Sequence, residues 1–167
     1  MGVLIVPVGL QNAYAQTTLT NEQLQLISAN CQSAKNTLNQ LHVTDALLRV
    51  NRGQLYEAVK SKLIDRFNSR LSSNGKDTAG LLVVTNGYAN AFNSFRQNYI
   101  AYERQLSAAI RIDCDTQPAQ FHNAVEEARA LRLKLHEDVG NLHEYIDDYR
   151  SAVNDLILND KSLRGEE

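Results

Sequence analysis

Three long stretches of this sequence repeat apolar residues at alternating steps of three and four. Of all the features of the sequence, this pattern restricts the possible folds most. Such a seam lies along one side of an α-helix, and a seam sustained over four or more heptads is typical of coiled coils. The 167 residues contain only two prolines and eight glycines, so little in the composition opposes long helices. The sequence therefore predicts an all-α protein built from helical rods.

The first seam predicts a helix that begins near Thr20 and ends before Gly75. Thr20 and Gln23 have the spacing of a capping box, in which each side chain satisfies a free backbone N–H group at the helix start. The seam slips between Leu41 and Leu55, in the region of Gly53, and then resumes. Its members are Leu24, Ile27, Cys31, Ala34, Leu38, Leu41, Leu55, Val59, Leu63, Phe67 and Leu71.

The second seam is rich in aromatic residues, and the third follows Pro118, which suits the first turn of a helix because an N–H group there would be unpaired. Asp115 or Thr116 could cap this last helix. Arg132 alone breaks the third apolar pattern, and we expect Leu131 to cover that gap. The second seam comprises Leu81, Val84, Tyr88, Phe92, Phe95, Tyr99, Tyr102, Leu106 and Ala109; the third comprises Phe121, Val125, Ala128, Leu135, Val139, Leu142, Ile146, Tyr149, Val153 and Leu156.

Three helices of about 50, 35 and 40 residues would be rods on the order of 75, 50 and 60 Å long. We predict an elongated antiparallel three-helix coiled coil, in which a helical hairpin is followed by a third helix. A turn near Gly75 brings Cys31 within about two helical turns of Cys114. These two cysteines allow one intramolecular disulfide, worth roughly 4 to 5 kcal/mol by loop entropy. Two buried free thiols or an intermolecular bridge are the alternatives.

The first residues have the pattern of the end of a secretory signal peptide. Residues 3–10 form an apolar run of eight, shorter than the roughly 20 residues of a membrane span but suited to a signal h-region. Ala13 and Ala15 supply the A-x-A pattern for cleavage before Gln16. We expect a signal-peptide remnant at 1–15, a coiled-coil domain at 16–158 and a frayed tail at 159–167. A frayed apolar N-terminus is the alternative to cleavage.

Charge and motifs argue against catalysis and against nucleic-acid binding. The net charge of −2 provides no general attraction to polyanions. The sequence contains no nucleophile elbow, zincin, dinucleotide-binding or Walker A motif, and no haem or di-iron ligand pattern. His136 and His143 are seven residues apart, whereas a chelating pair on a helix is three or four apart. We therefore expect no enzyme, catalytic residue, cofactor, metal or nucleic-acid partner.

One layer of side chains is a candidate small-ligand site. Measured from the cysteine end of the predicted bundle, Tyr56, Tyr88 and His143 fall at about the same height. A glycine inside a helix costs about 1 kcal/mol relative to alanine, so glycines at this height could mark close backbone approach, a kink or a cavity. They are Gly53, Gly87 and Gly140. The alternative is a core layer adapted to tyrosine and histidine.

Opposite charges near the predicted hairpin tip favour the same arrangement of helices. We expect a basic group on the first helix to pair with an acidic group near the end of the third. The alternatives are a solvated basic face and a docking patch for an anionic cell-surface polymer. The basic group is Lys60, Lys62, Arg66 and Arg70, and the acidic group is Glu144, Asp147, Asp148 and Asp155.

The chain also resembles a group of small secreted coiled-coil proteins from reduced-genome candidate-phylum bacteria. The resemblance rests on residues 49–57 (RVNRGQLYE), on residues 95–99 (FRQNY) and on Asp113-Cys114 before Pro118. That group has no known activity, so the resemblance implies a fold, export and pairing of Cys31 with Cys114, but no functional residues. The front end departs from the pattern, since the first basic residue is Lys35.

We therefore expect an exported, secreted or cell-envelope protein that acts without catalysis. It would be a helical scaffold or protein-interaction module, contacting a protein partner, another copy of itself or the cell surface through its rods, with no membrane span. The alternatives are a periplasmic chaperone-like holder of unfolded clients and a small-ligand-sensing helical bundle.

Overall fold

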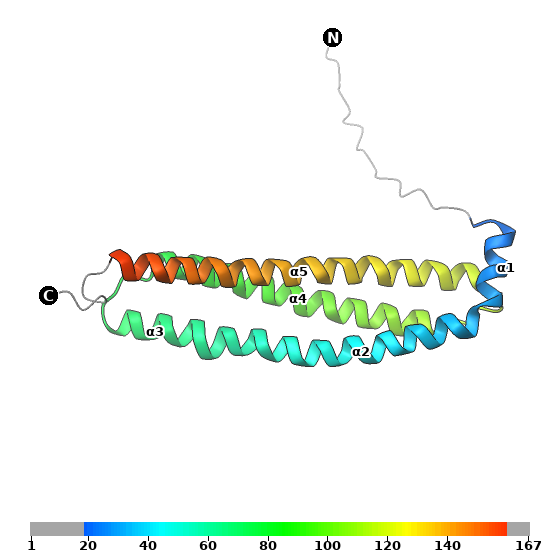
Figure 1. Ribbon diagram of the computed structural model, residues 1–167, viewed down its shortest axis with the longest axis horizontal. Coiled ribbons are helices and arrows are strands. Elements are labelled where there is room, and N and C mark those ends of the chain that lie inside the picture. Colours follow the sequence, from blue (N-terminus) through cyan, green and yellow to red (C-terminus); the bar gives the residue numbers. More distant parts are fainter. Residues whose placement is uncertain (1–18, 160–167) are drawn as a thin grey trace, which may run out of the picture.

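The chain folds into an elongated helical bundle closed by one disulfide, as the computed structural model of residues 19–159 shows (Figure 1). The continuous run of residues 31–73 lies alongside the helices at 79–111 and 118–159, and the short helix α1 (Asn21–Ala29) lies at one end of them. No strand occurs in the described range, so the predicted all-α class is confirmed. The predicted signal-peptide remnant lies outside the described residues. The elements are α1 (Asn21–Ala29), α2 (Cys31–Ala58), the π-helix η1 (Val59–Ile64), α3 (Asp65–Ser73), α4 (Ala79–Arg111) and α5 (Pro118–Asn159).

The first predicted rod is interrupted at Asn30, which separates α1 from α2. The capping box forms as predicted: the Thr20 N–H donates to Gln23 Oε1 at 2.8 Å, and the Gln23 N–H donates to Thr20 Oγ1 at 3.2 Å. The Asn30 side-chain amide donates to the carbonyl oxygen of Leu26 at 2.8 Å, a local bond of the kind that competes with helix continuation. The expectation of one uninterrupted helix from Thr20 was therefore wrong.

The seam along α2, η1 and α3 buries Cys31 and Leu71 as predicted, but between them it is shifted by one residue at two predicted positions, Leu55 and Leu63. Leu55 and Leu63 are 57% and 62% exposed, whereas Tyr56 and Ile64 are each 2% exposed. Steps of four, three and four residues back from Tyr56 reach Arg52, Arg49 and the buried Asp45. The three–four spacing is therefore continuous in this part of α2, and its positions are occupied by polar instead of apolar residues. Beyond Tyr56, η1 accommodates one extra residue in its wider turn and moves Ile64 into the core.

The hairpin turn after α3 forms where the sequence predicted it. Gly75 has a φ of +67°, a left-handed conformation that glycine adopts without a Cβ penalty. The Lys76 N–H donates to the Leu71 carbonyl oxygen and the Gly75 N–H donates to that of Ser72, each at 3.0 Å. These two bonds make a Schellman motif, which ends α3 and lets α4 run back alongside it.

The core follows the predicted second seam closely. Every predicted α4 seam residue is buried except Val84, which is half-buried. Leu131 packs against the central cluster, so it covers the gap at Arg132 as predicted. Three buried clusters succeed one another from the hairpin side to the disulfide end: Tyr56, Ile64, Tyr88, Phe92, Phe95, Val139 and Leu142; then Tyr99, Tyr102, Leu106 and Ala128; then Cys31, Cys114 and Phe121.

Within residues 19–159, no helix has both the length and the apolar character that crossing a membrane would take.

Candidate functional site

The disulfide joins Cys31, at the start of α2, to Cys114, in the loop between α4 and α5. Their Cα atoms are 5.4 Å apart, and both residues are buried against Phe121. The Ser28 hydroxyl donates to the Asp115 carbonyl oxygen at 3.2 Å, which ties α1 to the same loop. The predicted pairing is confirmed, and the bond closes the end of the bundle opposite the hairpin turn.

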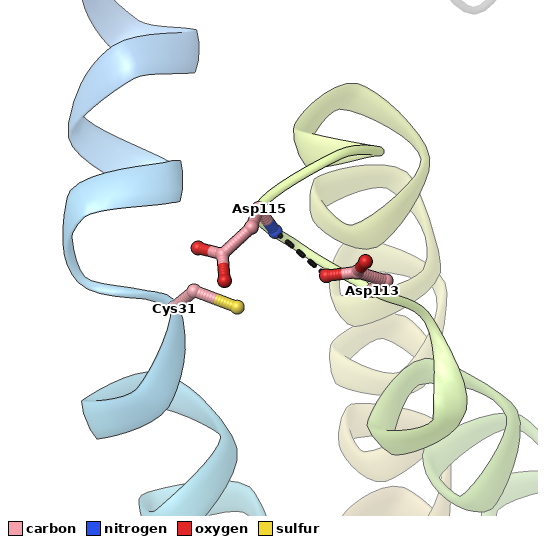
Figure 2. Close-up of side chains that lie close together, drawn as sticks. All are labelled: Cys31, Asp113 and Asp115. Carbon is pink, nitrogen blue, oxygen red and sulfur yellow. Dashed lines mark hydrogen bonds between the residues drawn. The ribbon is translucent and has the colours of Figure 1, made fainter.

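Two carboxylates, those of Asp113 and Asp115, lie beside the Cys31 side chain, as Figure 2 shows. Atoms of Cys31, Asp113 and Asp115 lie within 4.8 Å of one another. The Asp113 carboxylate accepts bonds from the Thr116 hydroxyl at 2.8 Å and the Asp115 N–H at 3.1 Å, and these bonds lower its pKa. The Cys31 sulfur is already bonded to Cys114 and is not a thiolate ligand. The group therefore organises the loop before α5. The prediction that Asp115 or Thr116 caps this helix was wrong, because the Thr116 hydroxyl donates to Asp113 and neither side chain accepts a bond from a helix N–H within the described range.

The predicted layer of Tyr56, Tyr88 and His143 does come together. The Tyr88 hydroxyl donates to the Tyr56 carbonyl oxygen at 2.8 Å, and the Tyr56 hydroxyl lies 3.2 Å from His143 Nε2. Burial raises the pKa of both tyrosines, so their hydroxyls are neutral near pH 7. Neither of the cavities described below is lined by any of these three residues. Tyr56 and Tyr88 are therefore packed parts of the core, whereas His143 is exposed and bonds to Tyr56 from the edge of the core.

Of the three glycines at this height, only Gly87 marks a close approach. A Cβ built on Gly87 would overlap the ring of Tyr145, lying 2.7 Å from Cζ and 3.0 Å from Cδ1. A Cβ on Gly53 or Gly140 would meet nothing within 4 Å. Of the three interpretations of these glycines, close approach therefore applies to Gly87 alone, where the neighbour is a side chain and not backbone.

A buried carboxylate joins the three helices at the centre of the bundle. Asp45 of α2 accepts a 2.6 Å hydrogen bond from the Tyr102 hydroxyl of α4, and bonds of 2.9 and 3.3 Å from the Arg132 guanidinium of α5. Burial raises the pKa of this carboxyl, but the bonds from Arg132 and Tyr102 outweigh burial and leave the pKa below its ordinary value. Asp45 is therefore a charged core residue held by partners on two other helices.

A second polar contact lies next to Asp45 and again joins α2 to α4. His42 Nε2 contacts a carboxylate oxygen of Glu103, and the Tyr99 hydroxyl donates to the other oxygen at 3.0 Å. Burial and the Glu103 carboxylate raise the pKa of Tyr99 to about 12. The Arg49 guanidinium lies 4.6 Å from the centre of the Tyr99 ring, in cation–π geometry.

Among these residues, Asp45, Arg49, Tyr99 and Arg132 border a cavity of about 340 Å³ between α2, α4 and α5, which we call the arginine cavity. Its basic residues come from α2 and α5, its deepest apolar residues come from α4 and α5, and Asp45 is the only carboxylate among its lining residues. The basic set is Arg49, Arg52, Arg129, Arg132 and His136. The apolar and aromatic set is Leu48, Phe95, Tyr99, Leu133, Leu135 and Val139.

A second cavity of about 470 Å³ lies between the far end of α5 and the η1–α3 run. It is lined by part of the predicted basic group, namely Lys62, Arg66 and Arg70. The expected ion pairs between this group and the acid-rich end of α5 do not form among the described residues. Instead, Lys60 pairs with Asp65 at 2.8 Å and Asp147 pairs with Arg150 at 3.1 Å, each within its own helical run.

Sequence reasoning missed Asp45, Arg49 and Arg52 as members of a site. The three follow one another by four and three on the side of α2 that continues to the buried Tyr56. The interruption of the apolar seam after Leu41, together with Arg132 on the third seam, was the pattern that could have located the arginine cavity.

No protein-family profile matches this sequence, and searches of curated proteins and of solved structures found no match.

Proposed function

We propose that this protein is an exported, non-enzymatic helical scaffold or protein-interaction module of the cell envelope. The observation that carries the proposal is an apolar stripe on α2, formed by Val43, Leu47 and Val50, which are 61%, 63% and 52% exposed. Steps of four and three place these side chains on one face of the helix. Contiguous exposed apolar surface of this kind marks interaction sites in soluble proteins.

Export is supported by the disulfide and by the predicted cleavage pattern. Disulfides persist in oxidising compartments and are rare in the cytosol, and here the bond closes the open end of the bundle. We also infer that the rods wind as a left-handed coiled coil. The support is that α4 buries residues at alternating steps of three and four along most of its length.

The stripe can be tested by replacing its three residues together, as Val43→Gln, Leu47→Gln and Val50→Gln. The control is Ile100→Gln on α4, which removes an apolar side chain of similar exposure, 51%, from another helix. Light scattering measures self-association over a range of protein concentration, and crosslinking on the native cell surface recovers a partner. We expect the triple variant to lose the self-association or the partner, and the control to keep it. Equal behaviour of the two variants would remove the stripe as the interaction surface.

A further inference from the structure

The arginine cavity concentrates positive charge in a chain whose net charge is −2. Four guanidinium groups border it, against the single carboxylate of Asp45, which is already bonded to Arg132. Arg129 pairs at 2.7 Å with Glu126, on the exposed surface of α5. Arg52 makes no ion pair or hydrogen bond with any residue in the 19–159 range. The cavity therefore has uncompensated positive charge, centred on Arg52.

The floor of the same cavity is apolar. Phe95, Tyr99 and Val139 are buried beneath it, and their side chains belong to the packed core. Leu48 and Leu133 also border it but remain exposed, from α2 and α5 respectively. An apolar body in the cavity would cover these two leucines, which no neighbouring helix covers.

We propose that the arginine cavity binds an organic anion that has one acidic headgroup on an aromatic or aliphatic body. The guanidinium of Arg52 donates to the headgroup, since planar guanidinium donors match carboxylate-like oxygens in pairs. Arg49 adds positive potential, and the body of the ligand lies on the apolar floor between the two leucines. The volume of about 340 Å³ lies in the range of small-ligand sites, roughly 300 to 1,000 Å³.

The proposed ligand is defined by two features of the cavity, its guanidinium groups and its apolar floor. A free inorganic anion would contact the guanidinium groups but would leave the apolar floor uncovered. A neutral apolar molecule would cover the floor but would leave the charge of Arg52 unmatched. The proposed ligand must therefore bind better than either of these partial analogues, and this comparison is what the experiment measures.

The test is a fluorescence titration of the full chain, with its disulfide intact, using 8-anilinonaphthalene-1-sulfonate. The matched neutral probe is N-phenyl-1-naphthylamine, which has the same aromatic body without the sulfonate. We expect saturable binding of the sulfonate at one site, about tenfold or more tighter than the neutral probe, because a charge-assisted hydrogen bond contributes at least a factor of this size. Laurate should displace the sulfonate, and inorganic phosphate at the same concentration should not.

The matched variants are Arg52→Gln in the cavity and Arg104→Gln, an exposed arginine on α4 outside it. We expect Arg52→Gln to weaken sulfonate binding about tenfold while leaving the neutral probe unchanged, and Arg104→Gln to change neither. Both side chains are exposed, and circular dichroism checks that helicity is retained. The α2 stripe variant should bind the sulfonate normally, which separates this proposal from the proposed interaction function.

Three results would overturn the assignment. Equal affinity for the two probes would show that the cavity does not select an anion. Equal affinity of Arg52→Gln and Arg104→Gln would show that Arg52 does not hold the headgroup. Displacement by phosphate as effective as displacement by laurate would show that the apolar floor contributes nothing.

Discussion

Reduction of the Cys31–Cys114 disulfide should destabilise the protein chiefly through the unfolded chain. The two cysteines are 83 residues apart, so the bond closes a loop of about half the molecule. For a loop of this length, the chain-entropy relation gives about 4.5 kcal/mol at 25 °C, an amount that native-state strain commonly reduces. Cys31 and Cys114 are buried against Phe121, and we expect the two thiols to stay there after reduction, so reduction should remove little packing from the folded state.

The assay is urea unfolding of the wild-type chain with and without reductant, followed by circular dichroism. We expect the free energy of unfolding to fall by about 3 to 4.5 kcal/mol on reduction. The slope of the transition should rise, because an unfolded chain without the cross-link exposes more surface. The double variant Cys31→Ala with Cys114→Ala is the control, and its transition should not respond to reductant.

Unfolding of the oxidised and reduced wild-type chains at the same urea concentration would show that the disulfide does not stabilise the fold. A response of the double alanine variant to reductant as strong as that of the wild type would show that the effect does not come from this bond. Peptide mass mapping under non-reducing conditions should recover one cross-linked pair from the monomer. Recovery of a cross-linked dimer instead would point to the intermolecular bridge that the sequence left open.

Three further substitutions test other parts of the bundle by the same urea assay. Gly140→Ala should raise the free energy of unfolding by about 1 kcal/mol, because the added methyl meets open space and alanine is the better helix former. Gly87→Ala should lower it by about 1 kcal/mol, because the methyl overlaps the Tyr145 ring; a gain as large as that of Gly140→Ala would contradict this packing. Asp45→Asn should cost about 1 to 2 kcal/mol at pH 7. Because the folded-state pKa of Asp45 is lowered, its contribution is present above about pH 4 and is lost as the pH falls through the folded value; a cost unchanged at pH 2.5 would refute this.

The seam of α4 could be predicted from sequence almost residue by residue. Its apolar and aromatic side chains keep a regular three–four spacing, and an α-helix without bulges carries that spacing directly into a buried face. The Schellman turn at Gly75 and the capping box at Thr20 were predictable for a similar reason. Each depends on residues within a few positions of one another, so no knowledge of the partner helices is needed.

The register beyond Tyr56 could not be predicted in the same way. A π-helical turn and an α-helical turn bury different residues of the same sequence. Which turn forms depends on which side chains pack better against the neighbouring helices. Here Ile64 packs into the cluster that holds Tyr88 and Phe92, and Leu63 stays in solvent. The turn type is therefore set by tertiary packing, which the period of apolar residues does not reveal.

The arginine cavity lies where two irregularities of the apolar seams meet, one on α2 and one on α5. In the sequence, the stretch around Arg49 and Arg52 interrupts the first apolar seam, and Arg132 is a single polar residue on the third. The structure places both irregularities at one level of the bundle, where Arg132 bonds to Asp45 across the gap between α2 and α5. Polar side chains on two facing seams keep these helices from packing as they do elsewhere, because a guanidinium group in an apolar interface would lose its hydration. The same residues that interrupt the seams therefore both create the cavity and give it its charge.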